Sequence, residues 1–302
     1  MGEPAQVVES VAAKYGAADL QITSQVNYVG VADERFVIKA PQSTQSMSSL
    51  IVEAATLAML RDGGPLAVKT PELVAFSADP LYLVATYLPG KVIEAADLPK
   101  ITPAERNTLG HDIGAYVLSQ AAQIDVATAQ HQIPPLDRKD TWESIFADSL
   151  GDFSASAFPA VSSLSHKLHN RWQQYQGNTA SEQFIHGDLR LGNMAVSADY
   201  RLQGVFDFGR AGVGTVSGEI SPLANLDTTI LQGVIDELRT AAVDIDMEEI
   251  HTWDEMKKLA QLANYIKAEN YRSEPPLFVK RACDMLRNRH PELDWSELNQ
   301  LF

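Results

Sequence analysis

The first ninety residues change from helical spacing of apolar side chains to short apolar runs separated by turn residues. Val7, Val11 and Ala12 share one face of a predicted helix over Pro4–Tyr15, which Gly16 can end. The runs that follow are rich in Ile, Val, Tyr and Phe, a composition typical of strands. The predicted strands are Leu20–Val26, Tyr28–Ala32, Phe36–Ala40, Leu73–Ser77 and Leu81–Tyr87. This part of the chain therefore predicts a small sheet with few helices.

A polar stretch and one helix separate the third predicted strand from the fourth. Gln42–Ser49 is rich in Ser, Gln and Thr, and this composition predicts a loop. The next residues predict a helix over roughly Ser49–Arg61, ended by the glycine and proline residues that follow. Glu53 would lie in the first turns of this helix.

Helical periodicity dominates most of the chain after residue 90. Thr102 and Glu105 have the spacing of a capping box, with Pro103 at the first helical position, and predict a helix to about Gln123. Further helices are expected over Thr141–Leu150, Pro159–Gln176 and several segments of Leu226–Phe302, the last near Pro276–Arg289. We expect Trp142 and Trp172 to anchor cores rather than to stack on a ligand.

Two short apolar runs interrupt this helical region, and each ends at an aspartate. FIHGDLRLGN carries Asp188, with Asn193 five residues later, and VFDFG carries Asp207. A turn between the two runs would bring both aspartates to one site, each at the end of its predicted strand. Magnesium prefers hard oxygens from one or two carboxylates, phosphate and water, and phosphoryl transfer depends on positioning and charge neutralisation. The pattern therefore predicts a site for magnesium and for a hydroxyl group that accepts a phosphoryl group.

The segments HGDLRLGN and VFDFG resemble the catalytic and metal-binding loops of the aminoglycoside phosphotransferase family. The resemblance covers nearly the whole chain and implies an α+β, two-lobed, protein-kinase-like fold. Residues 1–88 would form a small antiparallel-sheet lobe with one key helix, and residues 89–302 a larger, mostly helical lobe. The resemblance also implies Asp188 as the proton acceptor and Asn193 and Asp207 as Mg2+ ligands.

The same resemblance implies a site for ATP or GTP in the N-terminal lobe. Lys39 would hold the nucleotide phosphates and Glu53 would fix Lys39 by an ion pair, although two solvated surface charges are the alternative. The segment YLPG resembles the hinge that contacts the base, and we place these contacts at Ala85, Tyr87 and Leu88.

For several other polar residues, the sequence is compatible with either a functional or a structural role. Ser24 and Asn27 stand where a glycine-rich phosphate loop is absent, and they are either phosphate donors or parts of an ordinary hairpin turn. Arg190 either reaches the γ-phosphate or is simply exposed. Glu219 lies near the place where the family has an aspartate that braces the catalytic loop, and could replace it. The acids of Asp244–Glu249 are either ammonium ligands or a solvated face.

Composition narrows the class of protein. A chain of 302 residues is long enough for two lobes that each bury a core. The net charge of −15 argues against a nucleic-acid partner. It is compatible with a cationic substrate, and solubility of the protein is the alternative reason for the acidic surface. The single cysteine, Cys283, excludes an internal disulfide and a cysteine zinc cluster. No signal peptide and no apolar run of about 18 residues is present, so we expect a cytoplasmic protein without a membrane span, as a monomer or homodimer.

The sequence therefore predicts an enzyme that transfers the γ-phosphoryl group of ATP or GTP to a hydroxyl of a small molecule. Only nine residues separate Gly209 from Glu219, too few for the activation segment of a protein kinase. An aminoglycoside-like antibiotic is the first choice of acceptor. The alternatives are a metabolic kinase for a sugar, homoserine or choline-like alcohol, and a nucleotide-binding pseudokinase or regulatory module.

Overall fold

The computed structural model describes residues 3–24, 27–64, 66–135, 159–175, 182–267 and 277–296. The chain divides into two compact units, and the first comprises Met1–Asp137 and Ser181–Ile245. The second comprises Arg138–Ala180 and Asp246–Phe302. The lobe boundary after residue 88 falls inside the first unit and stays a prediction. Among the residues that the structure describes, no helix is both long and apolar enough to cross a membrane.

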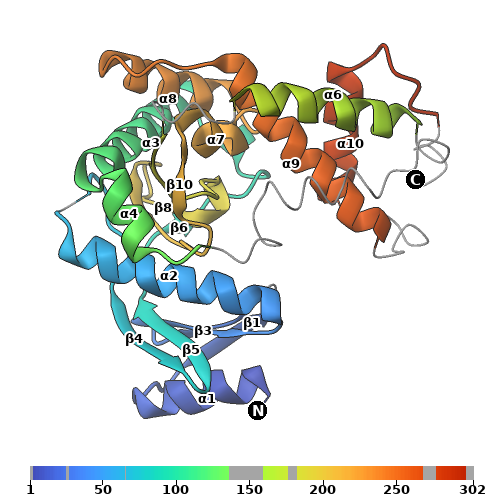
Figure 1. Ribbon diagram of the computed structural model, residues 1–302. Coiled ribbons are helices and arrows are strands. Elements are labelled where there is room, and N and C mark those ends of the chain that lie inside the picture. Colours follow the sequence, from blue (N-terminus) through green and yellow to red (C-terminus); the bar gives the residue numbers. More distant parts are fainter. Residues whose placement is uncertain are drawn as a thin grey trace. The chain divides into compact units, whose positions relative to one another are not determined.

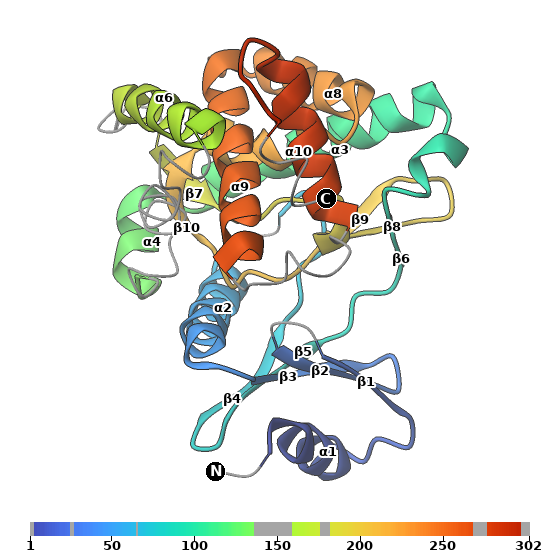
Figure 2. The ribbon, with the colours of Figure 1, turned by 90° about the vertical axis from the view of Figure 1, so that its right-hand side faces the viewer.

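The first unit begins with a five-stranded antiparallel sheet that lies between helices α1 and α2 (Figures 1 and 2). The strand order is β1-β2-β3-β5-β4, which places β3 at the centre. The strands are β1 (Leu20–Ser24), β2 (Asn27–Ala32), β3 (Phe36–Pro41), β4 (Leu73–Ala78) and β5 (Leu81–Thr86). Helix α1 (Pro4–Lys14) packs Val8 and Val11 against Ile38 and Val84 of the sheet. All five predicted strands are confirmed, with ends shifted by at most two residues.

Helix α2 (Thr44–Asp62) starts five residues earlier than the sequence predicted. The Ser43 hydroxyl accepts a hydrogen bond from the backbone N–H of Ser46 at 3.2 Å, and the Ser46 hydroxyl accepts one from the N–H of Ser43 at 3.0 Å. This reciprocal capping satisfies N–H groups that a helix start leaves unpaired. The predicted loop over Gln42–Ser49 is therefore wrong, because its serines begin a helix. Glu53 consequently lies in the middle of α2 rather than in its first turns.

Four α-helices, three short 3-10 helices and two small sheets complete the first unit in the part of the chain that the structure describes. Helix α3 (Pro103–Gln123) has the predicted capping box, and it packs closely on α8 (Thr228–Thr240). The contact is tight because a Cβ atom at Gly110 would lie 2.2 Å from the carbonyl oxygen of Ile230. The remaining elements are β6 (Lys91–Val92), η1 (Leu98–Lys100), α4 (Val126–Gln132), β7 (Glu182–Ile185), η4 (Leu191–Asn193), β8 (Met194–Val196), β9 (Leu202–Val205), β10 (Gly212–Thr215), α7 (Val216–Ile220) and η5 (Ser221–Leu223).

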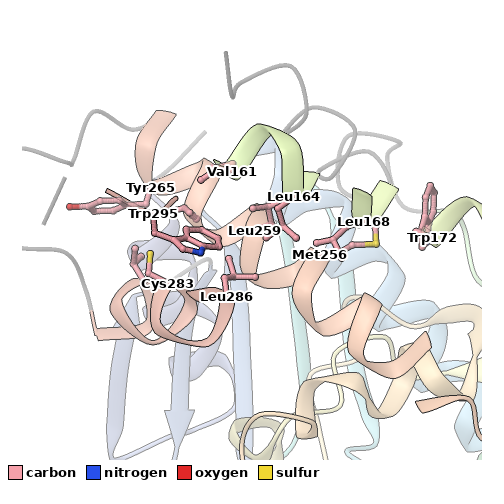
Figure 3. Close-up of a cluster of buried hydrophobic side chains, with 13 residues drawn as sticks. Val161, Leu164, Leu168, Trp172, Met256, Leu259, Tyr265, Cys283, Leu286 and Trp295 are labelled. Carbon is pink, nitrogen blue, oxygen red and sulfur yellow. The ribbon is translucent and has the colours of Figure 1, made fainter. Parts of the chain in front are cut away.

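The second unit is helical in the part of the chain that the structure describes, with its own apolar core (Figure 3). Its helices are α6 (Pro159–Tyr175), α9 (Met247–Lys267) and α10 (Leu277–Arg289). Trp172 on α6 is a buried member of this core and meets the ring of Trp253 edge-on at 6.3 Å, as expected for a core anchor. The predicted helix over Thr141–Leu150, with Trp142, lies outside the described residues.

The acidic segment before α9 contributes to the start of that helix. Asp246 accepts hydrogen bonds from the backbone N–H groups of Glu248 at 2.8 Å and Glu249 at 3.2 Å. These contacts are typical of a helix N-cap, and the carboxylate also complements the positive end of the helix dipole. They give Asp246 a structural role that needs no ligand.

Candidate functional site

A pocket of about 370 Å³ lies within the first unit, between the five-stranded sheet and the loops that carry Asn193 and Asp207. The predicted site residues that line it are Asn27, Lys39, Glu53, Ala85, Tyr87, Leu88, Asn193 and Asp207. Asp188 joins them through a hydrogen bond with Asn193. The structure therefore brings together nine of the ten residues that the sequence assigned to the site, and Ser24 is the exception.

Lys39 is the centre of a buried ion-pair cluster. Its ammonium donates to both carboxylate oxygens of Glu53, at 2.8 and 2.7 Å, and to Oδ1 of Asp207 at 2.7 Å. Strand β3 and helix α2 pack together, so these two elements bring Lys39 and Glu53 within reach of each other. The predicted Lys39–Glu53 pair is present, and the alternative of two solvated surface charges is wrong.

The charges of Lys39 and Asp207 stabilise each other. Burial alone would lower the pKa of Lys39, but the Asp207 and Glu53 carboxylates outweigh burial and raise that pKa above its ordinary value. Lys39 in turn holds the pKa of Asp207 below its ordinary value. Lys39 therefore stays protonated and Asp207 stays ionised at neutral pH, as phosphate and metal binding respectively would require.

The catalytic-loop candidate, His186-Gly187-Asp188, follows strand β7. The imidazole Nε2 of His186 donates to the carbonyl oxygen of Phe206 at 3.0 Å, and its Nδ1 accepts from the N–H of Asp188 at 3.2 Å. Gly187 has φ +78°, and a Cβ atom there would lie 2.0 Å from the carbonyl oxygen of Arg210. Only glycine fits this close approach and this backbone conformation without strain. The loop is therefore fixed both by its histidine and by its glycine.

Glu219, on helix α7, stabilises the same loop through hydrogen bonds to its backbone. Its Oε1 accepts from the backbone N–H of His186 at 2.8 Å, and its Oε2 accepts from that of Gly187 at 2.9 Å. Glu219 is almost fully buried, at 1% exposure. The sequence left open whether glutamate could do what aspartate does in the resembling family. Here the longer side chain reaches both N–H groups.

Asn193 and Asp188 form a second hydrogen-bonded pair. The amide nitrogen of Asn193 donates to the backbone oxygen of Asp188 at 2.9 Å and to its Oδ2 at 3.2 Å. These bonds leave the amide oxygen of Asn193 available to ligate a cation. Oδ1 of Asp188 has no hydrogen-bond partner in the part of the chain that the structure describes, so it is available to an incoming hydroxyl group.

Asp207 ends the apolar run after β9 with an unusual backbone. Its φ is +71°, a region that residues other than glycine rarely occupy and that costs of the order of 1–3 kcal/mol. The turn is held on one side by the hydrogen bond from the N–H of Phe206 to the carbonyl oxygen of Asn193, at 3.0 Å. Such strain is common at functional sites, and here it orients the carboxylate toward Lys39 and the pocket.

The hinge candidate follows β5 along the edge of the pocket. Ala85 is paired in the sheet with both Val37 and Leu73, and the N–H of Tyr87 donates to the carbonyl oxygen of Arg35 at 2.8 Å. The N–H of Leu88 donates to no group among the described residues. Of the three hinge residues that the sequence proposed, Leu88 is therefore the one whose N–H can bond to a base.

The β1–β2 hairpin contributes less than the sequence proposed. The hydroxyl of Ser24 is exposed and accepts from the side-chain amide of Gln42 at 2.7 Å, away from the pocket lining. Asn27 does line the pocket, and its Oδ1 is buried without a hydrogen-bond partner among the described residues. A buried orphan acceptor at a pocket wall suits a donor group on a ligand.

The sequence reasoning missed the apolar walls of the pocket. Arg190, whose role it had left open, also lines the pocket. Val29, Val31 and Val37 line the pocket on the same side of the sheet as Lys39. Alternation along β3 carries this signal, because Val37 and Lys39 are two residues apart and share a face. An apolar pocket with few polar groups at one end suits a purine base with a phosphate chain.

The donor set at the phosphate end fits magnesium. Among the described residues, no group of three or more His, Cys, Asp and Glu side chains could bind a metal ion by itself. Mg2+ bound with a nucleotide differs from such centres, because it takes one or two protein oxygens and completes its shell with phosphate and water. Asp207 and the amide oxygen of Asn193 are hard oxygen ligands that line one end of the pocket.

Comparisons with known proteins agree with this geometry. The model of the phosphotransferase enzyme family (APH) matches residues 20–259. The GDP complex of an aminoglycoside 2'-phosphotransferase-IIIa is 15% identical, with a TM-score of 0.74 over 96% of this chain and 99% of that chain. A streptomycin–ATP–APH(2")-IIa ternary complex is 15% identical, with a TM-score of 0.65 over 95% and 97%.

A third solved structure belongs to another subclass. The macrolide 2'-phosphotransferase MphH from Brachybacterium faecium is 16% identical, with a TM-score of 0.58 over 93% of this chain and 97% of that chain. A comparison with curated proteins finds no match. At these identities the likeness to solved structures is one of fold. It confirms the predicted α+β, protein-kinase-like architecture.

Proposed function

The chain belongs to the phosphotransferase enzyme family, and we propose that it transfers the γ-phosphoryl group of ATP or GTP to a hydroxyl group of a small molecule. One observation carries the proposal: Lys39, Asn193 and Asp207 line one pocket with apolar walls, and Asp188 is hydrogen-bonded to Asn193. Phosphoryl transfer needs this combination of a fixed cation, hard oxygens and a proton acceptor.

Lys39 supplies fixed positive charge for the nucleotide phosphates. Glu53 holds its ammonium from one side, so the charge is in place before the nucleotide binds. Preorganised charge of this kind stabilises a transition state without reorganisation at the moment of reaction. Asp207, 40% exposed at its side chain, can exchange its contact with Lys39 for a metal ion. Mg2+ held by Asp207 and Asn193 would neutralise charge on the phosphate oxygens.

Asp188 is the proposed proton acceptor. Its Oδ2 is occupied by Asn193, and its Oδ1 is the oxygen left for the acceptor hydroxyl. Gly187 and Glu219 fix the backbone on which this carboxylate stands. A positioned carboxylate of this kind contributes typically 10²–10⁴-fold in rate as a general base.

The proposed acceptor is an aminoglycoside-like antibiotic. Solved structures of the same fold are complexes with streptomycin, gentamicin and kanamycin, and the net charge of −15 complements a polycationic acceptor. A metabolic kinase for a sugar, homoserine or choline-like alcohol is the alternative acceptor class. A nucleotide-binding pseudokinase is the alternative without catalysis, and the complete set of polar groups argues against it.

The test is release of nucleoside diphosphate from Mg-ATP and from Mg-GTP with pooled acceptors. Aminoglycosides, macrolides, and sugars with amino alcohols form three separate pools. We expect turnover in the aminoglycoside pool, abolished by Asp188→Asn and retained by Asp199→Asn, an exposed acid outside the pocket. Turnover only in another pool would replace the proposed acceptor. If the protein bound nucleotide but released no nucleoside diphosphate in any pool, the result would favour the pseudokinase.

A further inference from the structure

Arg190 is a cation at the pocket that the proposed mechanism does not yet use. Its side chain lines the pocket beside Gly192 and Asn193. Its Nε lies 3.2 Å from Oδ2 of Asp188, and the side chain is 56% exposed.

The pairing of Arg190 with Asp188 places a guanidinium directly beside the carboxylate that is proposed to receive the hydroxyl proton. The guanidinium faces Oδ2, so it leaves Oδ1 open to the acceptor hydroxyl. An exposed ion pair of this kind is worth only about 0–1 kcal/mol. A stronger anion that entered the pocket would therefore take Arg190 away from Asp188 at little cost.

The position of Arg190 indicates which anion this is. In the transfer, the acceptor oxygen forms a bond to the γ-phosphorus while the bond from that phosphorus to the β–γ bridging oxygen breaks. The hydroxyl proton passes to Asp188 and the bridging oxygen leaves with the diphosphate. The acceptor oxygen must lie about 2.6–3.2 Å from Asp188 and about 3–3.5 Å from the γ-phosphorus. A guanidinium next to Asp188 is therefore within reach of the γ-phosphoryl oxygens.

We propose that Arg190 is a catalytic residue that leaves Asp188 when nucleotide binds and holds the γ-phosphoryl oxygens through the transfer. The proposal rests on the phosphotransferase function above. The planar guanidinium can bind two phosphoryl oxygens at once, which a lysine cannot do with the same geometry. Lys39, on the Asp207 side, holds the rest of the phosphate chain. Arg190 and Lys39 therefore bind different parts of the phosphate chain.

These separate contacts predict that loss of Arg190 affects the binding of a nucleoside triphosphate more than the binding of a diphosphate. Dissociation constants are measured with Mg2+ for ADP and for an ATP analogue with an imido group between the β- and γ-phosphorus. We expect Arg190→Gln to weaken binding of the analogue by roughly 10–100-fold, the range for a charged hydrogen bond. ADP binding should stay within about twofold, because ADP has no γ-phosphoryl group. Arg190→Lys should restore part of the loss.

The matched control is Arg201→Gln. Arg201 is 52% exposed and paired with Asp112 at 2.7 Å, so it resembles Arg190 in exposure and pairing but lies outside this pocket. It should change neither dissociation constant. With an active acceptor, Arg190→Gln should lower kcat by about 10²–10³-fold, the effect of removing one preorganised donor, and leave KM for the acceptor near its wild-type value.

Several outcomes would overturn the proposal. Equal weakening of ADP and the analogue by Arg190→Gln would mean a general electrostatic or structural effect. Unchanged binding of both would mean that Arg190 is only an exposed side chain, and wild-type protein that binds the analogue no better than ADP would exclude a γ-phosphate contact from the start. The binding measurements need no acceptor. A selective loss for the analogue would therefore support the role of Arg190 even if every acceptor pool failed.

Discussion

Replacement of Glu219 tests whether the geometry of the catalytic loop depends on a single buried carboxylate. Glu219 accepts the N–H groups of His186 and Gly187 at 2.8 and 2.9 Å, immediately before Asp188. Glu219→Ala would leave both N–H groups unsatisfied in a buried environment. Each such orphan donor costs about 1–3 kcal/mol. We therefore expect the two orphan donors to cost roughly 2–6 kcal/mol in the free energy of unfolding.

The effect on rate should exceed the effect on nucleotide binding. Glu219 bonds to the catalytic loop, whereas Lys39 is held by Glu53 and Asp207, so the dissociation constant for Mg-ATP should stay close to that of the wild type. A displacement of Asp188 by about 1 Å would lower kcat on the order of 10²-fold. Glu219→Asp is one methylene shorter and cannot keep both bonds, so we expect it to lie between Glu219→Ala and the wild type.

The assay combines urea unfolding with steady-state kinetics at a temperature where every variant is folded. Asp227→Ala is the matched control. Asp227 also accepts two backbone N–H groups, from Thr229 at 2.9 Å and Ile230 at 3.0 Å, and it pairs with Arg106. The control should lose comparable stability and keep its kcat. If Glu219→Ala kept its kcat within about threefold of the control, the bracing argument would be wrong.

Three further substitutions have definite expected results. Gly187→Ala places a Cβ 2.0 Å from the carbonyl oxygen of Arg210 at φ +78°, so we expect a loss of at least about 2 kcal/mol in urea unfolding and a lower kcat; wild-type stability would contradict the clash. Ala85→Phe fills the inner wall of the pocket and should weaken Mg-ATP binding at least about tenfold by calorimetry. Burial raises the pKa of Asp254 to about 6, above about 3.9 when unfolded, so the folded state binds more protons between these values. The wild type should therefore lose about 2–3 kcal/mol of stability between pH 4 and pH 7 relative to Asp254→Asn, and parallel curves would contradict the raised pKa.

The strands and the paired motifs could be predicted because their signals are local. Alternating apolar residues predict a strand where one face is buried, and each aspartate follows directly after a short apolar run. The two runs form β7 and β9, which belong to different sheets, so strand pairing does not explain why the loops after them share one site. Lys39 and Glu53 needed the family resemblance as well, because nothing in the spacing of 14 residues requires them to touch.

The misses involve side chains whose partners are set by the fold. Ser43 and Ser46 could belong to a loop or to a helix cap, and only their reciprocal bonds decide the matter. Ser24 bonds to Gln42, a residue 18 positions away in the chain, instead of facing the pocket. The role of Glu219 depends on the distance from α7 to the loop, which composition does not encode. The contact of Arg190 with Asp188 is likewise visible only in three dimensions.

The most direct test of the central claim is the mass of the acceptor after incubation with Mg-ATP, compared between wild type and Asp188→Asn. Calorimetry first establishes that both proteins bind Mg-ATP with similar affinity. Wild-type protein should add one phosphoryl group to a hydroxyl of the acceptor, and Asp188→Asn should leave the acceptor unmodified. Equal phosphorylation by both proteins would contradict the role of Asp188, and hydrolysis of ATP without a modified acceptor would contradict phosphoryl transfer to a small molecule.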